Sequence, residues 1–116
     1  MKLLAHGSVL YADRDRIWGA LDKVHARTKV TMLLTTDARG ACYEALEWAK
    51  SNGVTPYMFI PDFQKYGHSA IQKLNKRIIA EGAPEGMVAF PGNKHTAELV
   101  EMAKAIPIPV WQPYGR

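Results

Sequence analysis

Short apolar runs alternate along this chain with longer segments in which apolar residues recur at helical spacing. The short runs, bounded by glycine, proline or polar residues, predict strands at residues 2–6, 30–34, 57–60, 87–90 and 106–111. Between them, apolar positions three and four residues apart predict helices whose buried stripes span residues 17–24, 41–49, 70–78 and 99–103. The chain therefore reads as a β-α unit repeated four times and closed by a last strand.

This alternation predicts an α/β fold. Strands joined through helices form right-handed crossovers, which give a parallel sheet covered on both faces. We expect a three-layer Rossmann-like domain of about five strands, occupying residues 1–116 as one unit. Pro107 and Pro109 place the last strand at an edge, because proline cannot donate to a central ladder. Asp13 is the expected N-cap of the first helix and Gly53 the left-handed cap of the second.

Composition narrows the classes of protein without naming a function. The chain has 15 lysines and arginines against 11 acids, a formal charge of +4, but the basic residues are spread along it. Nucleic acid is therefore a disfavoured partner, because a nucleic-acid surface needs a clustered basic patch. No export signal or membrane-spanning run is evident, so we expect a cytoplasmic protein that does not engage a membrane. The four histidines lack metal-ligand spacing, and neither a metal nor a cofactor is expected.

The turns after the predicted strands are where a ligand should bind, since ligands of such sheets lie outside the carboxyl ends of the strands. Gly7 and Ser8 permit close approach of a backbone, although they also make an ordinary turn. The segment 91–96 joins a tight turn to a helix start, where unpaired N–H groups attract anions; the alternative is a loop capped by Asn93 or Thr96. These readings stay open at the level of sequence.

The turn at 37–40 carries one negative and one positive side chain. Arg39 could grip a phosphate or pair with Asp37, and the preferred role of Asp37 is to cap the second helix. Cys42, in the first turn of that helix, is read as a small buried side chain rather than a reactive thiol.

Several segments, taken in order, resemble the YspA-like branch of the SLOG superfamily, which recurs in bacterial and phage genomes and is related to LOG and DprA domains. Gly7-Ser8 with Tyr11 resembles its first turn, and the segment 36–42 (TDARGAC) resembles its Gly-Gly-Ala-Arg-Gly-Ala-Asp turn. The segments 62–75 and 90–96 (FPGNKHT) resemble its later motifs. The chain departs from the family pattern at several positions of these turns, namely Val9, Leu10, Thr36, Asp37, Cys42, Leu74, Asn93 and His95.

The resemblance implies a Rossmann-like fold that binds nucleotides or nucleotide-derived ligands, in relatives that are often dimers and that include sensors and nucleoside-monophosphate hydrolases. We therefore expect a homo-oligomer, encoded by a phage or a bacterium, that binds or senses a nucleotide-like small molecule without catalysis. The expected ligand-binding residues are Gly7, Ser8, Arg39, Gly40, Pro91, Gly92, Asn93, His95 and Thr96. One alternative is a phosphoribohydrolase-like enzyme using Glu98 and Arg39; the other is an interaction module with a degenerate site.

Overall fold

Five parallel strands form the centre of the structure, a computed structural model that describes residues 1–115. The strands are β1 (Lys2–His6), β2 (Met32–Thr36), β3 (Thr55–Phe59), β4 (Gly86–Ala89) and β5 (Val110–Trp111). Their order in the sheet is β3-β2-β1-β4-β5, so the chain winds outward from β1 in one direction and then from β4 in the other. The point where the order reverses lies between β1 and β4, and it is there that such sheets open a crevice for ligands.

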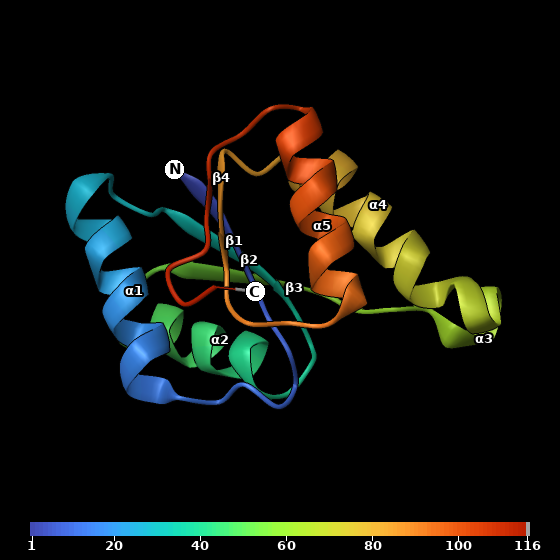
Figure 1. The fold of residues 1–116 in the computed structure, drawn as a ribbon, viewed down its shortest axis with the longest axis horizontal. Helices are drawn as coiled ribbons and strands as arrows, with labels where there is room; N and C mark the ends of the chain where they lie inside the picture. The colour runs from blue at the N-terminus through green and yellow to red at the C-terminus, as the bar shows by residue number, and fades with distance from the viewer. Residues whose placement is uncertain (116) are drawn as a thin grey trace.

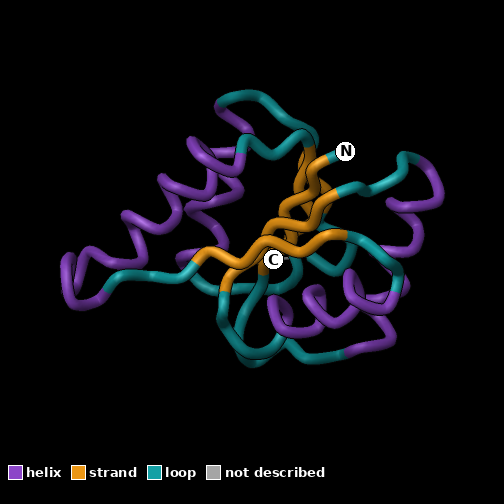
Figure 2. Tube along the Cα trace, turned by 180° about the vertical axis from the view of Figure 1, so that it is seen from behind, coloured by secondary structure: helices purple, strands orange, loops and turns teal. Residues whose placement is uncertain are grey.

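Helices cover both faces of this sheet. They are α1 (Arg14–Arg27), α2 (Ala41–Ser51), the one-turn α3 (Phe63–Tyr66) with the 3-10 turn η1 (Gly67–Ser69), α4 (Ala70–Gly82) and α5 (Lys94–Ala105). Figure 1 shows α1 and α2 on one side of the strands and α4 and α5 on the other. Figure 2, from behind, shows the strands as the middle layer between these helices. The prediction of a three-layer Rossmann-like fold is confirmed.

Two apolar clusters, one on each face, stabilise the sheet. Alternate strand residues point to opposite faces, so Leu3 packs with α1 and α2 while Leu4 packs with α4 and α5. On the first face the largest buried side chain is Trp48, whose Nε1 donates a 2.8 Å hydrogen bond to Asp22. On the second face Leu34 and Ile78 are almost fully buried. The two apolar clusters therefore hold β1 and β4, the strands at the point where the strand order reverses, from both sides of the sheet.

Two of the three predicted helix caps are confirmed, and the exception has a local cause. Asp13 caps α1 by accepting from Arg16 N at 3.2 Å, and Gly53 follows α2 with a φ of 66°. Asp37, in contrast, is exposed and does not cap α2, whose N-cap is Gly40. The prediction of an aspartate cap was wrong because the chain takes three more residues to reach the helix.

The bounds of four strands differ from the prediction, and β1 alone has the predicted bounds. β2 begins at Met32 rather than 30, β3 begins at Thr55 rather than 57, β4 lies one residue earlier at Gly86–Ala89 rather than 87–90, and β5 is reduced to Val110 and Trp111. The segment 61–67, expected to be a plain turn, contains α3, because Asp62 accepts a hydrogen bond from Lys65 N at 3.0 Å and starts a helical turn. The edge position of the last strand is confirmed. Within residues 1–115, no helix is long and apolar enough to cross a bilayer.

Candidate functional site

Three turns meet at the carboxyl ends of β1 and β4. Ser8, after β1, donates its backbone N–H to the carbonyl of Pro91, after β4, at 3.0 Å. The carbonyl of Ser8 accepts from the N–H of Ala41, the first residue of α2, at 3.3 Å. The structure thus brings Gly7, Ser8, Gly40 and Pro91 together, as neighbours around one backbone junction.

The glycines of this junction are required by chain packing. A Cβ at Gly7 would lie 2.6 Å from the Cβ of Ala41 and 2.9 Å from that of Phe90. Gly40 has a φ of 71°, and a Cβ there would lie 2.5 Å from the carbonyl oxygens of Ser8 and Val9. At these two positions, neighbouring residues of the chain itself therefore lie against the glycine backbone, where the sequence suggested that a ligand would approach.

The turn after β4 is organised around the N-terminus of α5. The side-chain oxygen of Asn93 accepts from His95 N at 3.0 Å and from Thr96 N at 3.4 Å, so it occupies two of the amides that an anion would otherwise use. A Cβ at Gly92 would overlap the side chain of Thr96. Of the two alternatives, the structure contains the loop capped by Asn93.

A buried polar group lies directly beneath this turn. His6, the last residue of β1, is 7% exposed, and its Nδ1 lies 2.8 Å from the hydroxyl of Thr96. Burial, with a smaller contribution from the nearby charge of His95, lowers the pKa of His6 to about 4. His6 is therefore neutral at pH 7, and it joins β1 to the first turn of α5.

Asn75 holds the same turn from the neighbouring helix α4. It is buried on α4, and its side-chain amide donates to the carbonyl of His95 at 3.3 Å. We did not predict either Asn75 or His6 as a site residue. A signal was present for Asn75, since it is a polar residue next to Leu74 on the apolar stripe of its helix.

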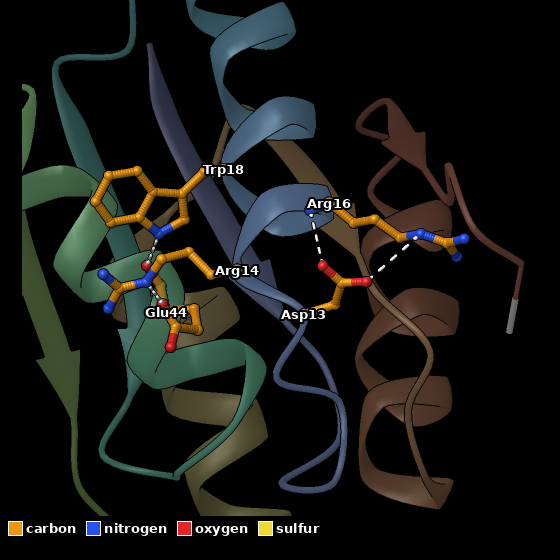
Figure 3. A network of polar contacts seen from close by, with 5 residues as sticks. All are labelled: Asp13, Arg14, Arg16, Trp18 and Glu44. Atoms are coloured by element: carbon orange, nitrogen blue, oxygen red, sulfur yellow. Dashed lines mark hydrogen bonds and ion pairs between the residues drawn. The ribbon is translucent and has the colours of Figure 1, made fainter.

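The long turn between β1 and α1 is tied down at its far end by α2. Figure 3 shows Arg14 and Trp18 both reaching Glu44: Arg14 Nε is 2.7 Å from its carboxylate, and Trp18 Nε1 donates to its carbonyl at 3.1 Å. The same view shows Asp13 between the backbone N–H and the guanidinium of Arg16. This network holds the end of the turn at α2 while its middle, Val9 and Leu10, is exposed.

Tyr11 fills the inner side of this turn. Its ring stacks on Phe90 with 6.0 Å between centroids, and its hydroxyl is buried without a hydrogen-bond partner in the described part of the chain. A buried phenol normally finds a partner, so this oxygen is an unused polar group, on a ring that stacks against the residue after β4.

A small cavity of about 100 Å³ opens along α5, from its first turn to Lys104 in its last turn. It is lined by residues of α5, of the turn before it and of the segment after β5, namely Phe90, Gly92, Asn93, Thr96, Ala97, Val100, Glu101, Lys104 and Gln112. The predicted residues Gly92, Asn93 and Thr96 thus border a cavity, whereas Gly7, Ser8 and Gly40 do not. The other six lining residues were not predicted, among them the polar side chains of Glu101, Lys104 and Gln112.

The remaining candidates lie apart from this cavity. Arg39 is exposed, and Glu98 is half-buried on α5; neither lines the cavity. Cys42 is buried. Within residues 1–115, no group of three or more histidine, cysteine or acidic side chains is arranged to hold a metal ion.

The parallel sheet, its strand order and the polar turns at its reversal point define a Rossmann-like α/β protein. Residues 1–66 match the family described as YspA, cpYpsA-related SLOG, and the chain belongs to that family. The match spans β1 to α3, including the turns at Gly7 and Arg39, and ends before the turn after β4. No curated protein and no solved structure matches the chain.

Proposed function

We propose that this protein binds a nucleotide-derived ligand across the carboxyl ends of β1 and β4, without catalysis. The observation that carries the proposal is the junction of three polar turns at the reversal point of the sheet, in a chain that belongs to a SLOG family. The unused hydroxyl of Tyr11 and the cavity beside α5 support the same location.

The size of the cavity limits what it accepts. Whole ligands usually occupy roughly 300–1,000 Å³, and this cavity has about 100 Å³. It therefore accommodates one polar group, such as a phosphate or a ribose, with Thr96, Lys104 and Gln112 as hydrogen-bond or charge partners. The rest of the ligand would lie outside the cavity, over the exposed middle of the turn after β1. There the exposed guanidinium of Arg39 would pair with a second anionic group of the ligand.

The placement of the carboxylates supports binding without catalysis. Acid-base cleavage of a glycosidic bond commonly needs two carboxyl groups flanking the scissile bond. The cavity borders Glu101 alone among the acids, and Glu98, the predicted candidate, does not reach its lining. Hydrolysis is accordingly the second candidate rather than the first.

Thermal unfolding in the presence of AMP, ADP, NAD and ADP-ribose tests the proposal. A ligand at 100 times its Kd stabilises the native state by about 2.7 kcal/mol, which raises the Tm of a chain of this size by roughly 10 °C. The variant Arg39→Gln should reduce the shift, and the matched variant Lys50→Gln, on an exposed lysine at the end of α2, should not.

Two results would contradict the proposal. A Tm that no compound of the panel raises would reject nucleotide binding at this junction. Release of free base from AMP, abolished in Glu98→Gln, would show the hydrolase reaction instead and overturn the noncatalytic assignment.

A further inference from the structure

A second, more voluminous cavity than the one beside α5 lies at the other end of the sheet, near the amino ends of the strands. It is a groove of about 710 Å³ between α1 on one side and β4 and β5 on the other. Its floor and walls are mainly apolar, formed by Met1, Leu3, Val24, Ala26, Gly86, Met87, Val88, Pro109, Val110 and Trp111, and its polar residues are Lys23, Arg27, Thr28 and Glu85. None of these residues belongs to the proposed nucleotide site.

The groove exists because one helical layer is incomplete. The crossovers from β1 to β2 and from β2 to β3 place α1 and α2 on the same face, and Figure 1 shows α1 to the left of the strands and α2 below them. In the described residues no helix follows β5, so β4 and β5 have no helix of their own on that face. The ring of Trp111, paired in register with Val88, is 40% exposed there.

A glycine on the floor of the groove leaves space that a side chain would otherwise occupy. Gly86 pairs in register with Leu3, whose side chain belongs to the cluster under α1. A Cβ at Gly86 would meet the sulfur of Met1 at 3.5 Å and Leu3 at 3.8 Å, which are ordinary contacts. A side chain is therefore sterically possible at this position, and its absence leaves the space open.

The rim of the groove is asymmetric in charge. Lys23 and Arg27 lie four residues apart on α1, which places them on one helix face. Both are exposed, and in the described part of the chain neither forms an ion pair. Glu85, on the opposite wall, already accepts from Lys2 N at 2.9 Å. The free charge at the rim is thus positive and lies along α1.

The geometry points to a second binding site in this groove, for an amphipathic carboxylate. Its apolar chain or ring lies along Val24, Val88 and Trp111, and its carboxylate pairs with Lys23 and Arg27. The volume is within the roughly 300–1,000 Å³ of small-molecule sites, which are mostly apolar with a few placed polar groups. Two cations on one wall of an otherwise apolar groove match a molecule that carries a single anionic group on an apolar body.

Decanoate tests this assignment on the full chain, with decanol and decyltrimethylammonium as uncharged and cationic probes of equal chain length. Titration is followed by calorimetry and by tryptophan fluorescence, because Trp111 borders the groove. We expect saturable binding of decanoate and at least tenfold weaker binding of the other two. The double variant Lys23→Glu, Arg27→Glu should weaken decanoate binding at least tenfold.

The matched control is Lys50→Glu, Lys76→Glu, which makes the same change of net charge at exposed helix positions outside the groove. It should leave decanoate affinity within twofold. A second, uncharged variant, Gly86→Val, fills the floor and should also abolish binding while retaining a cooperative thermal transition.

Three outcomes would overturn the assignment. One is decanol or the cation binding as tightly as decanoate. Another is decanoate affinity that survives the charge reversal. The third is a dimer in sedimentation that the charge reversal dissociates, because the groove would then be occupied by a second copy of the chain.

Discussion

His6 is a buried base whose protonation opposes folding. Its pKa in the native state is lowered to about 4, whereas an unfolded histidine titrates near 6.5. Between these values the unfolded chain binds a proton that the native state does not, so the free energy of unfolding falls as the pH drops through this window. The loss amounts to something on the order of 3 kcal/mol and is complete near pH 4.

Urea unfolding between pH 7.5 and 4 measures this loss. His6→Gln should flatten the pH dependence across the window, whereas His68→Gln, at an exposed position, should leave it unchanged. If the free energy of unfolding changes with pH equally in His6→Gln and in the wild type, a group other than His6 is responsible for the pH dependence.

Asn93 makes a different kind of contribution, because its side chain occupies amides at the start of α5. Replacing an asparagine N-cap by glycine costs only a few tenths of a kcal/mol. The variant Asn93→Gly frees His95 N and Thr96 N for an anionic group of a ligand. We therefore expect a Tm only slightly below that of the wild type and a larger upward shift with a nucleotide that binds.

The same nucleotide panel, run on wild type and variant at equal ligand concentration, measures the difference. Asn93→Ser, which keeps a capping oxygen, is the matched control and should behave as the wild type. An unchanged or smaller ligand shift in Asn93→Gly would mean that no anionic group reaches these amides.

At the scale of elements, Gly40 allows α2 to begin in close contact with the turn that follows β1. Its φ of 71° and the 2.5 Å approach to two carbonyl oxygens make any side chain both strained and crowded. Gly40→Ala should lower the free energy of unfolding by at least ~2–3 kcal/mol, beyond the cost of left-handed backbone alone.

Gly53→Ala is the matched control for this variant. Gly53 has nearly the same φ, 66°, but nothing lies within 4 Å of its Cβ position. Its cost should therefore be about 1–2 kcal/mol, the backbone penalty without the clash. Equal losses in the two variants, measured by urea unfolding, would show that crowding at the junction contributes nothing.

The elements also show what a sequence can and cannot predict. Local patterns were sufficient for the strands and for the Asp13 cap, because periodicity and capping depend on residues close in the chain. The length of β5 was not predictable: its apolar run is six residues, but Pro107 and Pro109 restrict pairing with β4 to Val110 and Trp111.

At the scale of the molecule, the candidate site was predictable in place but not in composition. Parallel topology brings the turns together at the carboxyl ends, so Gly7, Gly40 and Pro91 were expected to be neighbours. Gln112 was not, because it reaches the cavity only through the path of the chain after α5. The groove under Trp111 likewise depends on which face lacks a helix, and a strand pattern carries no such information.

The family match raises a question of cooperativity across the whole molecule. It ends at Tyr66, yet β1, in the centre of the sheet, pairs with both β2 and β4. In a fragment 1–66 the second face would lose α4 and α5, exposing Leu4, Leu34 and Phe59. Exposure of three such side chains costs about 5–9 kcal/mol, which is comparable to the total stability of a small domain.

We therefore expect the fragment 1–66 to show no cooperative thermal transition by circular dichroism, and its tryptophans, Trp18 and Trp48, to emit as exposed residues. Adding the fragment 67–116 in equimolar amount should restore the transition and the buried emission, because β4 then pairs again with β1 and the second face is covered. A cooperative transition of 1–66 alone would instead mean that the face carrying Trp48 is sufficient to fold the matched segment, and that β4 joins a sheet already formed.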